Sequence, residues 1–152
     1  MNDPQQPNEH SQPSPHPALG LDYGNSRIGV AATDDFGIMA HPVETIDTTR
    51  VTDPIQRIAE IAAIRKTRTL VVGLPLRLDG SEGDAVKLVR KFSTKLAESI
   101  PAIPMVFVDE TYTTSDASQK LHEAGRNTRK QKAVIDQAAA VEILNRWMEE
   151  IS

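Results

Sequence analysis

Apolar residues recur along the chain at intervals that change from the spacing of strands to the spacing of helices. Alternating or continuous apolar runs predict three strands close together, at Ala18–Tyr23, Arg27–Thr33 and Ile38–Ile46. The short polar segments between them, Gly24-Asn25-Ser26 and Asp34-Asp35-Phe36-Gly37, are typical of tight turns. We therefore expect these strands to form an antiparallel meander.

Helical spacing begins after the meander. Thr52 or Asp53 can cap a helix that has Pro54 in its first turn and continues to Arg65-Lys66. A second helix is predicted from about Glu82 to Ser99. Its apolar stripe consists of Ala85, Leu88, Val89, Phe92 and Leu96.

Two further strands alternate with helices in the rest of the chain. Thr69–Leu74 is a short apolar run of the kind found in a strand buried on both faces, and Pro104–Asp109 is the fifth predicted strand. The remaining helices are predicted at about 113–125, capped by Thr113 or Ser115, and at about 133–150. The order βββαβαβαα predicts an α/β fold with a mixed five-stranded sheet and helices packed on it.

Length and composition fit one domain with a polar tail. The 152 residues can bury one core. Residues 1–17 carry five of the ten prolines and have no apolar residue after Met1, which predicts a disordered tail before a domain at 18–152. The tail lacks the apolar core of a secretory signal, and no window approaches the roughly 18 apolar residues of a membrane span. We therefore expect a soluble, cytoplasmic protein.

The absence of cysteine excludes disulfides, iron–sulfur clusters and thiolate zinc sites, and it leaves carboxylates as the expected metal ligands. The formal net charge of −4 argues mildly against a nucleic-acid partner. However, the segment 126–132 has four basic residues and no acid: Arg126, Arg129, Lys130 and Lys132. Its spacing is equally compatible with a solvated loop and with a surface for nucleic acid.

Asp22 stands at the end of the first strand, where a carboxylate needs a partner. An unpaired carboxylate in a buried strand is strongly disfavoured. Gly20 and Gly24 lie on the same face by alternation and would leave room for a phosphate or a hydrated ion. The alternative, which Asp22 taken alone favours, is that its side chain only bonds turn amides.

Two more acids stand at comparable junctions. Glu110 follows Asp109 at the end of the fifth strand, and Asp136 begins the otherwise apolar face of the last helix. A first-turn interaction with the helix dipole would also account for Asp136, although less well for its place on that face. Three converging carboxylates would repel one another without a cation, and Mg²⁺ or Mn²⁺ suits such oxygen ligands.

A glycine-containing loop follows the fourth strand. Gly73-Leu74-Pro75 and then Gly80-Ser81 precede the second predicted helix, and their backbone amides could hold a phosphate. An ordinary strand-to-helix turn with Ser81 as the N-cap would have the same sequence.

These segments together resemble the YqgF (RuvX-like) family of bacterial RNase H-like nucleases, whose members are described as Holliday junction resolvases and as pre-16S rRNA processing nucleases. Four motifs match in order and cover nearly the whole chain after the tail. They are Leu21-Asp22-Tyr23-Gly24 with Arg27–Ala31, Gly73-Leu74-Pro75 with Asp79-Gly80-Ser81, Asp109-Glu110 with Thr113-Thr114, and Asp136 with Ala139-Ala140.

The resemblance implies an RNase H-like fold and phosphodiester hydrolysis with Mg²⁺ or Mn²⁺. Asp22, Glu110 and Asp136 would be the catalytic and metal-binding acids, with a metal-activated water as the attacking group. The residues expected to contact structured RNA or branched DNA are Arg27, Gly73, Pro75, Gly80, Ser81, Arg126, Arg129, Lys130 and Lys132. In one departure from the family, Thr111 stands where an arginine is usual and Tyr112 where an aliphatic residue is common. If the usual arginine binds substrate phosphate, its absence would weaken binding or shift the task to Arg27 or Arg126.

Three other functions are weighed against an rRNA nuclease. Asp-x-Gly after a first strand also opens the phosphate loop of sugar-kinase and actin-like ATPases, but those need two such domains and this chain has length for one. A non-catalytic ribosome-assembly module would keep the acids for structural reasons. A Holliday junction resolvase would need a dimer to cut two strands symmetrically. Both nuclease substrates present the same phosphate chemistry, and the family description favours rRNA processing.

Overall fold

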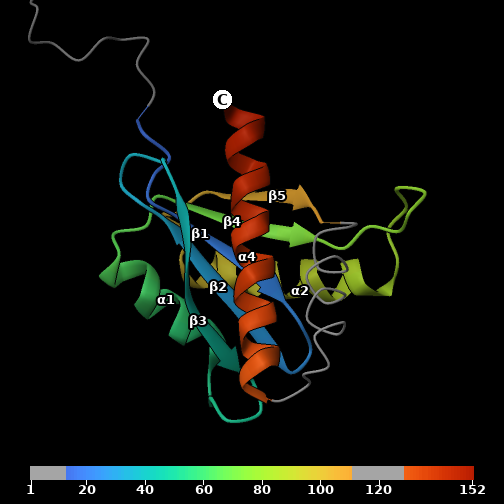
Figure 1. Ribbon diagram of the computed structural model, residues 1–152. Helices are drawn as coiled ribbons and strands as arrows, with labels where there is room; N and C mark the ends of the chain where they lie inside the picture. Colours follow the sequence, from blue (N-terminus) through green and yellow to red (C-terminus); the bar gives the residue numbers. More distant parts are fainter. Residues whose placement is uncertain (1–12, 111–128) are drawn as a thin grey trace, which may run out of the picture.

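The computed structural model describes residues 13–110 and 129–152 (Figure 1). In this part of the chain, five strands and three helices follow the predicted order. Their bounds are β1 (Ala18–Tyr23), β2 (Arg27–Thr33), β3 (Ala40–Asp47), α1 (Pro54–Ile64), β4 (Thr69–Leu74), α2 (Asp84–Ser99), β5 (Met105–Asp109) and α4 (Arg129–Ile151).

The strands form one mixed sheet in the order β3-β2-β1-β4-β5. β1 pairs antiparallel with β2, and β2 with β3, which confirms the meander. β4 and β5 are parallel to β1, because each is reached through a helical crossover. The carboxyl ends of β1, β4 and β5 and the start of β2 therefore lie at the same edge of the sheet, which we call the site edge.

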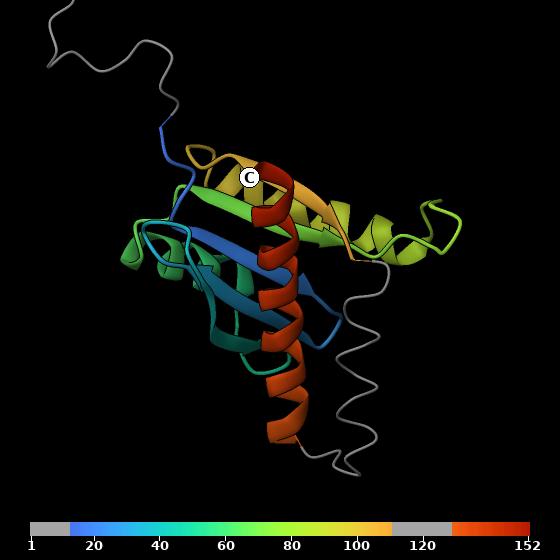
Figure 2. The ribbon, with the colours of Figure 1, turned by 45° about the horizontal axis from the view of Figure 1, so that its top comes forward.

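Helices cover the two faces of the sheet unequally. Of the helices in the described part of the chain, α1 and α2 lie on one face and α4 crosses the other (Figures 1 and 2). The larger core lies under α1 and α2 and includes Leu21, Ile28, Val72 and Phe92. The smaller core lies under α4 and includes Ala31, Val71, Ile143 and Trp147.

Helix α1 begins as the sequence predicts. The Oδ1 atom of Asp53 accepts a hydrogen bond from the amide of Gln56, and Pro54 is the first helical residue. The first of the two predicted caps, Thr52, is not used.

Three predicted elements begin later than expected, namely β3, α2 and β5, which starts at Met105 and not at Pro104. β3 starts at Ala40 and not at Ile38, because the Asp34 carboxylate accepts hydrogen bonds from the amides of Phe36, Ile38 and Met39 and closes them into a loop. α2 starts at Asp84 after Gly83, and its buried stripe contains Val86 and Ser93 in place of the predicted Ala85 and Leu88.

Helix α4 begins at Arg129, four residues earlier than predicted. Helical spacing predicts that Ala140, Ile143, Trp147 and Ile151 continue the face that Asp136 begins; the first three are buried, whereas Ile151 is exposed. The helix predicted at 113–125 lies outside the described residues.

The folded part of the chain begins before Ala18. Thr69 donates a hydrogen bond from Oγ1 to the carbonyl of Pro15, and the His16 ring packs edge-on against Trp147 at 5.2 Å between centroids. The last residues of the predicted tail therefore belong to the domain. No helix in residues 13–110 and 129–152 has the length and apolar character needed to cross a membrane.

Candidate active site

Three acidic side chains reach the site edge from three different elements. Asp22 is the fifth residue of β1, and its side chain is on the face that α4 covers. Glu110 follows β5 directly and is tied to β4 by a 3.0 Å hydrogen bond from its amide to the carbonyl of Leu74. Asp136 lies in α4, which packs over β2 and β1. Asp22 and Glu110 are only 9% and 5% exposed.

The carboxyl groups of Asp22 and Glu110 are hydrogen-bonded to each other. Such a bond forms only when one of the two carboxyls is protonated, because two ionised carboxylates have no hydrogen to donate. The pKa of Asp22 is raised to about 6, because burial raises it most, the negative charge of Asp136 also raises it, and the hydrogen bond from Glu110 lowers it in part. The three acids therefore act on one another electrostatically, as a converging cluster requires.

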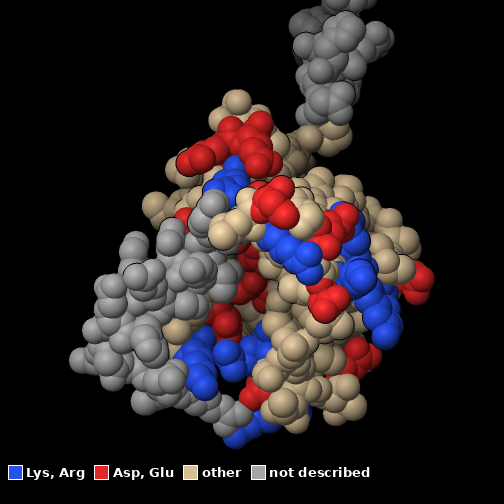
Figure 3. Space-filling model, turned by 90° about the vertical axis from the view of Figure 1, so that its right-hand side faces the viewer, with Lys and Arg blue, Asp and Glu red and all other residues tan. Residues whose placement is uncertain are grey.

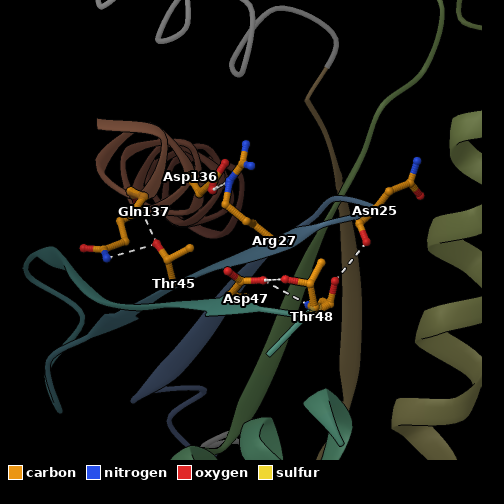
Figure 4. Close-up of polar contacts among 9 residues, drawn as sticks. Asn25, Arg27, Thr45, Asp47, Thr48, Asp136 and Gln137 are labelled. Carbon is orange, nitrogen blue, oxygen red and sulfur yellow. Dashed lines mark hydrogen bonds and ion pairs between the residues drawn. The ribbon is translucent and has the colours of Figure 1, made fainter. Parts of the chain in front are cut away.

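Arg27 holds Asp136. Its Nε atom donates a 2.6 Å hydrogen bond to Oδ2 of Asp136, and the two side chains face each other above β2 (Figure 4). Burial raises the pKa of the Asp136 carboxyl, and the hydrogen bond and charge of Arg27 oppose this increase. Burial therefore raises the pKa of Asp136 by more than the hydrogen bond and charge of Arg27 lower it.

The helix dipole does not account for Asp136. Because α4 begins at Arg129, Asp136 is its eighth residue, about 10 Å along the axis from the helix start. The dipole acts mainly within the first turn. The acid is therefore placed by packing and by Arg27.

Glycines shape the site, although only one of them leaves space for a functional group. A Cβ atom on Gly73 of β4 would lie 2.7 Å from Cδ of Glu110, so the missing side chain makes room for that carboxyl. The space expected beside Asp22 for a phosphate or a hydrated ion is occupied by the protein itself. At Gly20 it is taken by Leu144 and Ala140 of α4, and Gly24 closes a turn with the carbonyl of Arg27. Neither glycine leaves the expected space for a phosphate or an ion.

A basic surface adjoins the acids. Arg27 and Lys130 line a cavity of about 490 Å³ with Thr45, Asp47 and Arg50. Arg27 and Lys132 line a second cavity of about 240 Å³. The structure thus places Lys130 and Lys132 in the first turn of α4 beside Arg27, and not in a loop as the sequence suggested.

Two other predicted basic contacts are only partly described. Arg129 is the first residue of α4, but its side chain lies outside the described part of the structure, and so do Arg126, Thr111 and Tyr112. Figure 3 looks onto the edge where β4 and β5 end, and it shows acidic side chains inside a hollow with basic side chains along its lower side.

The loop after β4 has its own internal hydrogen bonds. The amide and hydroxyl of Ser81 both donate to Oδ1 of Asp79, and the amide of Gly80 donates to the carbonyl of Arg77. Ser81 does not cap α2, because Gly83 occupies the cap position. Two amides expected to face a phosphate, those of Gly80 and Ser81, are thus already paired, while Pro75 has no amide hydrogen to donate. The role of this loop in substrate binding stays a prediction.

A polar contact near the site was missed by the sequence analysis. Thr45 of β3 donates from Oγ1 to the carbonyl of Ala133 and accepts a hydrogen bond from Nε2 of Gln137 (Figure 4). It fixes the start of α4 over the edge strand and thereby helps to position Asp136. No local pattern indicates this contact, because its partners are 88 and 92 positions away.

No three side chains of the metal-binding types are close enough to hold an ion within the part of the chain that the structure describes. Asp22 and Glu110 are in contact, but Asp136 is engaged by Arg27. The three acids lie at one edge of the sheet without forming a closed coordination cage, and their role as metal ligands stays a prediction.

Comparison with known families identifies the chain. The model of the RuvX family, described as Holliday junction resolvase, matches residues 16–150. The chain belongs to the RuvX family. The motifs that suggested this family therefore indicated it correctly, and the RuvX family is one of nuclease or resolvase type.

Curated relatives in the RuvX family support the same assignment. A protein of Cutibacterium acnes named "Putative pre-16S rRNA nuclease" is 49% identical over 133 residues, which are 88% of this chain and 82% of that protein. A protein of the same name from Streptomyces coelicolor is 44% identical over 131 residues, covering 86% of this chain and 78% of its own length.

Solved structures agree with an RNase H-like resolvase fold for this RuvX-family chain. A fowlpox virus resolvase in complex with Holliday junction DNA aligns with a TM-score of 0.56 at 12% identity, over 89% of this chain and 98% of that one. T. thermophilus RuvC in complex with a Holliday junction substrate aligns with a TM-score of 0.52 at 12% identity, over 89% and 96%. The predicted fold class is confirmed.

Proposed function

We propose that this protein is a metal-dependent nuclease that hydrolyses phosphodiester bonds in the 5′-end processing of pre-16S rRNA, in the cytoplasm. The observation that carries the proposal is the hydrogen-bonded pair of buried carboxyls, Asp22 and Glu110, with the charge of Asp136 acting on it. Two buried acids in contact have no structural need for each other, since an apolar pair would cost less. The names of the relatives supply the substrate.

The donor set fits a divalent cation. Three carboxylates supply hard oxygen ligands, and burial together with the charge of Asp136 raises the pKa of Asp22, so a cation would stabilise its ionised form. Asp22 and Glu110 would hold Mg²⁺ or Mn²⁺, and Asp136 would join them by exchanging the guanidinium of Arg27 for the ion. When bound, the cation would activate water and stabilise the charge on the leaving oxygen.

The chain's own residues would orient the substrate. Once Asp136 turned away, Arg27 would be free to pair with a phosphate oxygen at the same place. Lys130 and Lys132, with Arg129 from the same helical turn, would hold the backbone of the nucleic acid, which makes binding strongly dependent on salt. Gly73 would contribute indirectly, because it makes room for the carboxyl of Glu110.

A second candidate function is resolution of Holliday junctions. The family description names that activity, and the fold is shared with two resolvases solved with junction DNA. Symmetric cutting of a junction would require a homodimer that presents two sites. A non-catalytic role in ribosome assembly would instead leave the acids without a chemical task.

One cleavage assay separates these functions. Wild type and Asp22→Asn are incubated with precursor 16S rRNA and with four-way DNA junctions, with Mg²⁺, with Mn²⁺ and with a chelator. We expect wild type to cut the precursor rRNA only with metal, and Asp22→Asn to bind it without cutting. Preferential cutting of junctions by a dimer would support the resolvase. If Asp22→Asn retained full biological activity, the protein would be a binding module.

A further inference from the structure

A pocket lies behind the acidic site, on the opposite face of the sheet. It has a volume of about 340 Å³, within the range of small-molecule sites. It is bounded by the β1–β2 turn, the start of α1 and the middle of α2. Its lining includes Tyr23, Asn25, Leu88, Lys91, Phe92 and Lys95.

The floor of this pocket is aromatic and apolar. The rings of Tyr23 and Phe92 stack with their centroids 4.5 Å apart, and Leu88 of α2 continues the apolar surface while remaining 45% exposed. Phe92 is only 6% exposed, so the half-buried Tyr23 ring supplies most of the accessible aromatic surface, and such a flat surface favours a planar ligand ring. An exposed leucine at the mouth leaves part of the floor open to solvent.

The rim of the pocket is positively charged. Lys91 and Lys95 stand one turn apart on α2, and neither forms an ion pair with any residue in the described part of the structure. The single acid of the lining, Asp53, already accepts the hydrogen bond that caps α1. The apolar floor of the pocket and the two lysines at its rim together suit an anion that carries a flat ring.

A polar side chain at the rim can add hydrogen bonds. The carbonyl of Asn25 accepts a 2.9 Å hydrogen bond from Oγ1 of Thr48, which fixes the turn. Its side-chain amide points away from the Arg27–Asp136 pair, to the side on which α2 lies (Figure 4). An amide offers both a donor and an acceptor, as the edge of a nucleobase requires.

The pocket is coupled to the acidic site through one strand end. Tyr23 directly follows Asp22, so their Cα atoms are about 3.8 Å apart while their side chains point to opposite faces. A nucleic-acid chain that passes around the end of β1 would therefore have access to both places.

We propose that this pocket binds an unpaired nucleotide of the substrate, with its base on the Tyr23–Phe92 surface and its phosphate at Lys91 and Lys95. The inference rests on the proposed nuclease function for the nature of the ligand. It adds a preference for single-stranded nucleic acid next to the cleaved bond, because a base within a duplex is not available for stacking.

Binding of a six-nucleotide, fluorescently labelled RNA by the full chain tests this proposal. Fluorescence anisotropy is measured in a chelator so that no cleavage occurs. Leu88→Glu places a negative charge at an exposed position of the floor, and Lys91→Gln/Lys95→Gln removes both cations. We expect each to lower the affinity at least about fivefold, the effect of losing one stacked base or its phosphate contacts.

Matched controls lie at the far end of α1 and on another face of α2. Ile64→Glu changes an exposed apolar residue in the same way as Leu88→Glu, and Lys66→Gln/Lys87→Gln removes two cations that do not line the pocket. We expect both controls to bind the RNA within about twofold of wild type. Circular dichroism melting of every variant shows whether each one is folded.

A duplex with and without a six-nucleotide unpaired extension completes the test. The extension should strengthen binding by wild type and by the controls but not by the pocket variants. Equal losses in pocket and control variants, or an extension effect that survives in the pocket variants, would overturn the inference. Failure of the proposed function looks different, because wild type would then cut no RNA with metal although its binding still depended on the pocket.

Discussion

Gly29 of β2 lies directly under the backbone of Asp136 in α4. A Cβ atom on Gly29 would be 2.0 Å from the carbonyl oxygen of Asp136 and 2.4 Å from its carbonyl carbon. Gly29 is also the register partner of Asp22 across the β1–β2 pair. One residue without a side chain therefore sets how close the helical acid comes to the acid in the strand.

Gly29→Ala should destabilise the protein by about 3 kcal/mol, because the new methyl group meets backbone that cannot rotate away. Chemical denaturation measures this loss. Gly80→Ala is the control, since its surroundings are open and only its positive φ opposes alanine, at a cost of about 1 kcal/mol. Similar losses in the two variants would mean that the contact between β2 and α4 is not tight.

Asp22→Asn should stabilise the metal-free protein above pH 6 while it removes cleavage. The folded protein binds a proton at Asp22 more readily than the unfolded chain, whose carboxyl has the ordinary value of 3.8. Stability therefore falls as the pH rises from about 4 through 6, by up to about 3 kcal/mol, and asparagine avoids that loss. Denaturation in chelator at pH 4 and pH 8 should show a difference from wild type only at pH 8.

The opposite sign is expected for Asp34→Asn. Backbone amides of the β2–β3 loop lower the pKa of Asp34, so its ionised form contributes stability above the unfolded pKa, and this is lost as the pH falls. This substitution should weaken folding at neutral pH and leave cleavage intact.

If Asp22→Asn weakened folding at pH 8 as well, Asp22 would be a structural residue, and the case for a buried acid kept for chemistry would fail.

Gly73→Ala should reduce activity more than stability. The added methyl group would meet the carboxyl of Glu110 and the end of the Ile143 side chain, and the ends of side chains can move where backbone atoms could not. We expect Mn²⁺ binding, measured by calorimetry, to weaken about tenfold or more. Gly83→Ala is the matched control, because its nearest contact is the flexible end of Arg77. Unchanged Mn²⁺ affinity in Gly73→Ala would remove Glu110 from the proposed metal site.

Lys130→Gln/Lys132→Gln should lower affinity for RNA without changing the rate at saturating substrate. Each lost phosphate contact reduces the slope of log affinity against log salt by about 0.7 to 0.9, so the double variant should lose roughly 1.5. Lys66→Gln/Lys87→Gln removes the same net charge elsewhere. If both double variants lost the same slope, the effect would come from net charge and not from the basic turn of α4.

Local patterns predicted most of the elements, and they failed at places where side chains intervene. The strand Thr69–Leu74 was predicted with its final bounds, because a short apolar run is sufficient to define a buried strand. β3 was predicted to start two residues too early, because hydrogen bonds to Asp34 draw Ile38 and Met39 into the loop. The apolar pattern of α2 was similarly offset, since the helix exposes Leu88 and buries Val86.

The candidate acids were found from their positions, but their partners were not. Asp22 and Asp136 stand out in the sequence as acids in apolar surroundings. Nothing in the sequence indicated that Asp136 would meet Arg27, 109 positions away, or that the glycine at position 20 would serve helix packing in place of a ligand. The catalytic and metal-binding roles of the three acids stay predictions.

The sequence by itself determined the order of strands and helices, the antiparallel meander and the family, because hydrophobic period, turn residues and short motifs are properties of neighbouring positions. Only the tertiary structure decided that Asp22 shares a hydrogen bond with Glu110, that Arg27 holds Asp136, and that glycines admit α4 to the sheet. These relationships depend on which strands lie side by side and on how closely a helix crosses them. That outcome is set by the packing of the whole chain at once.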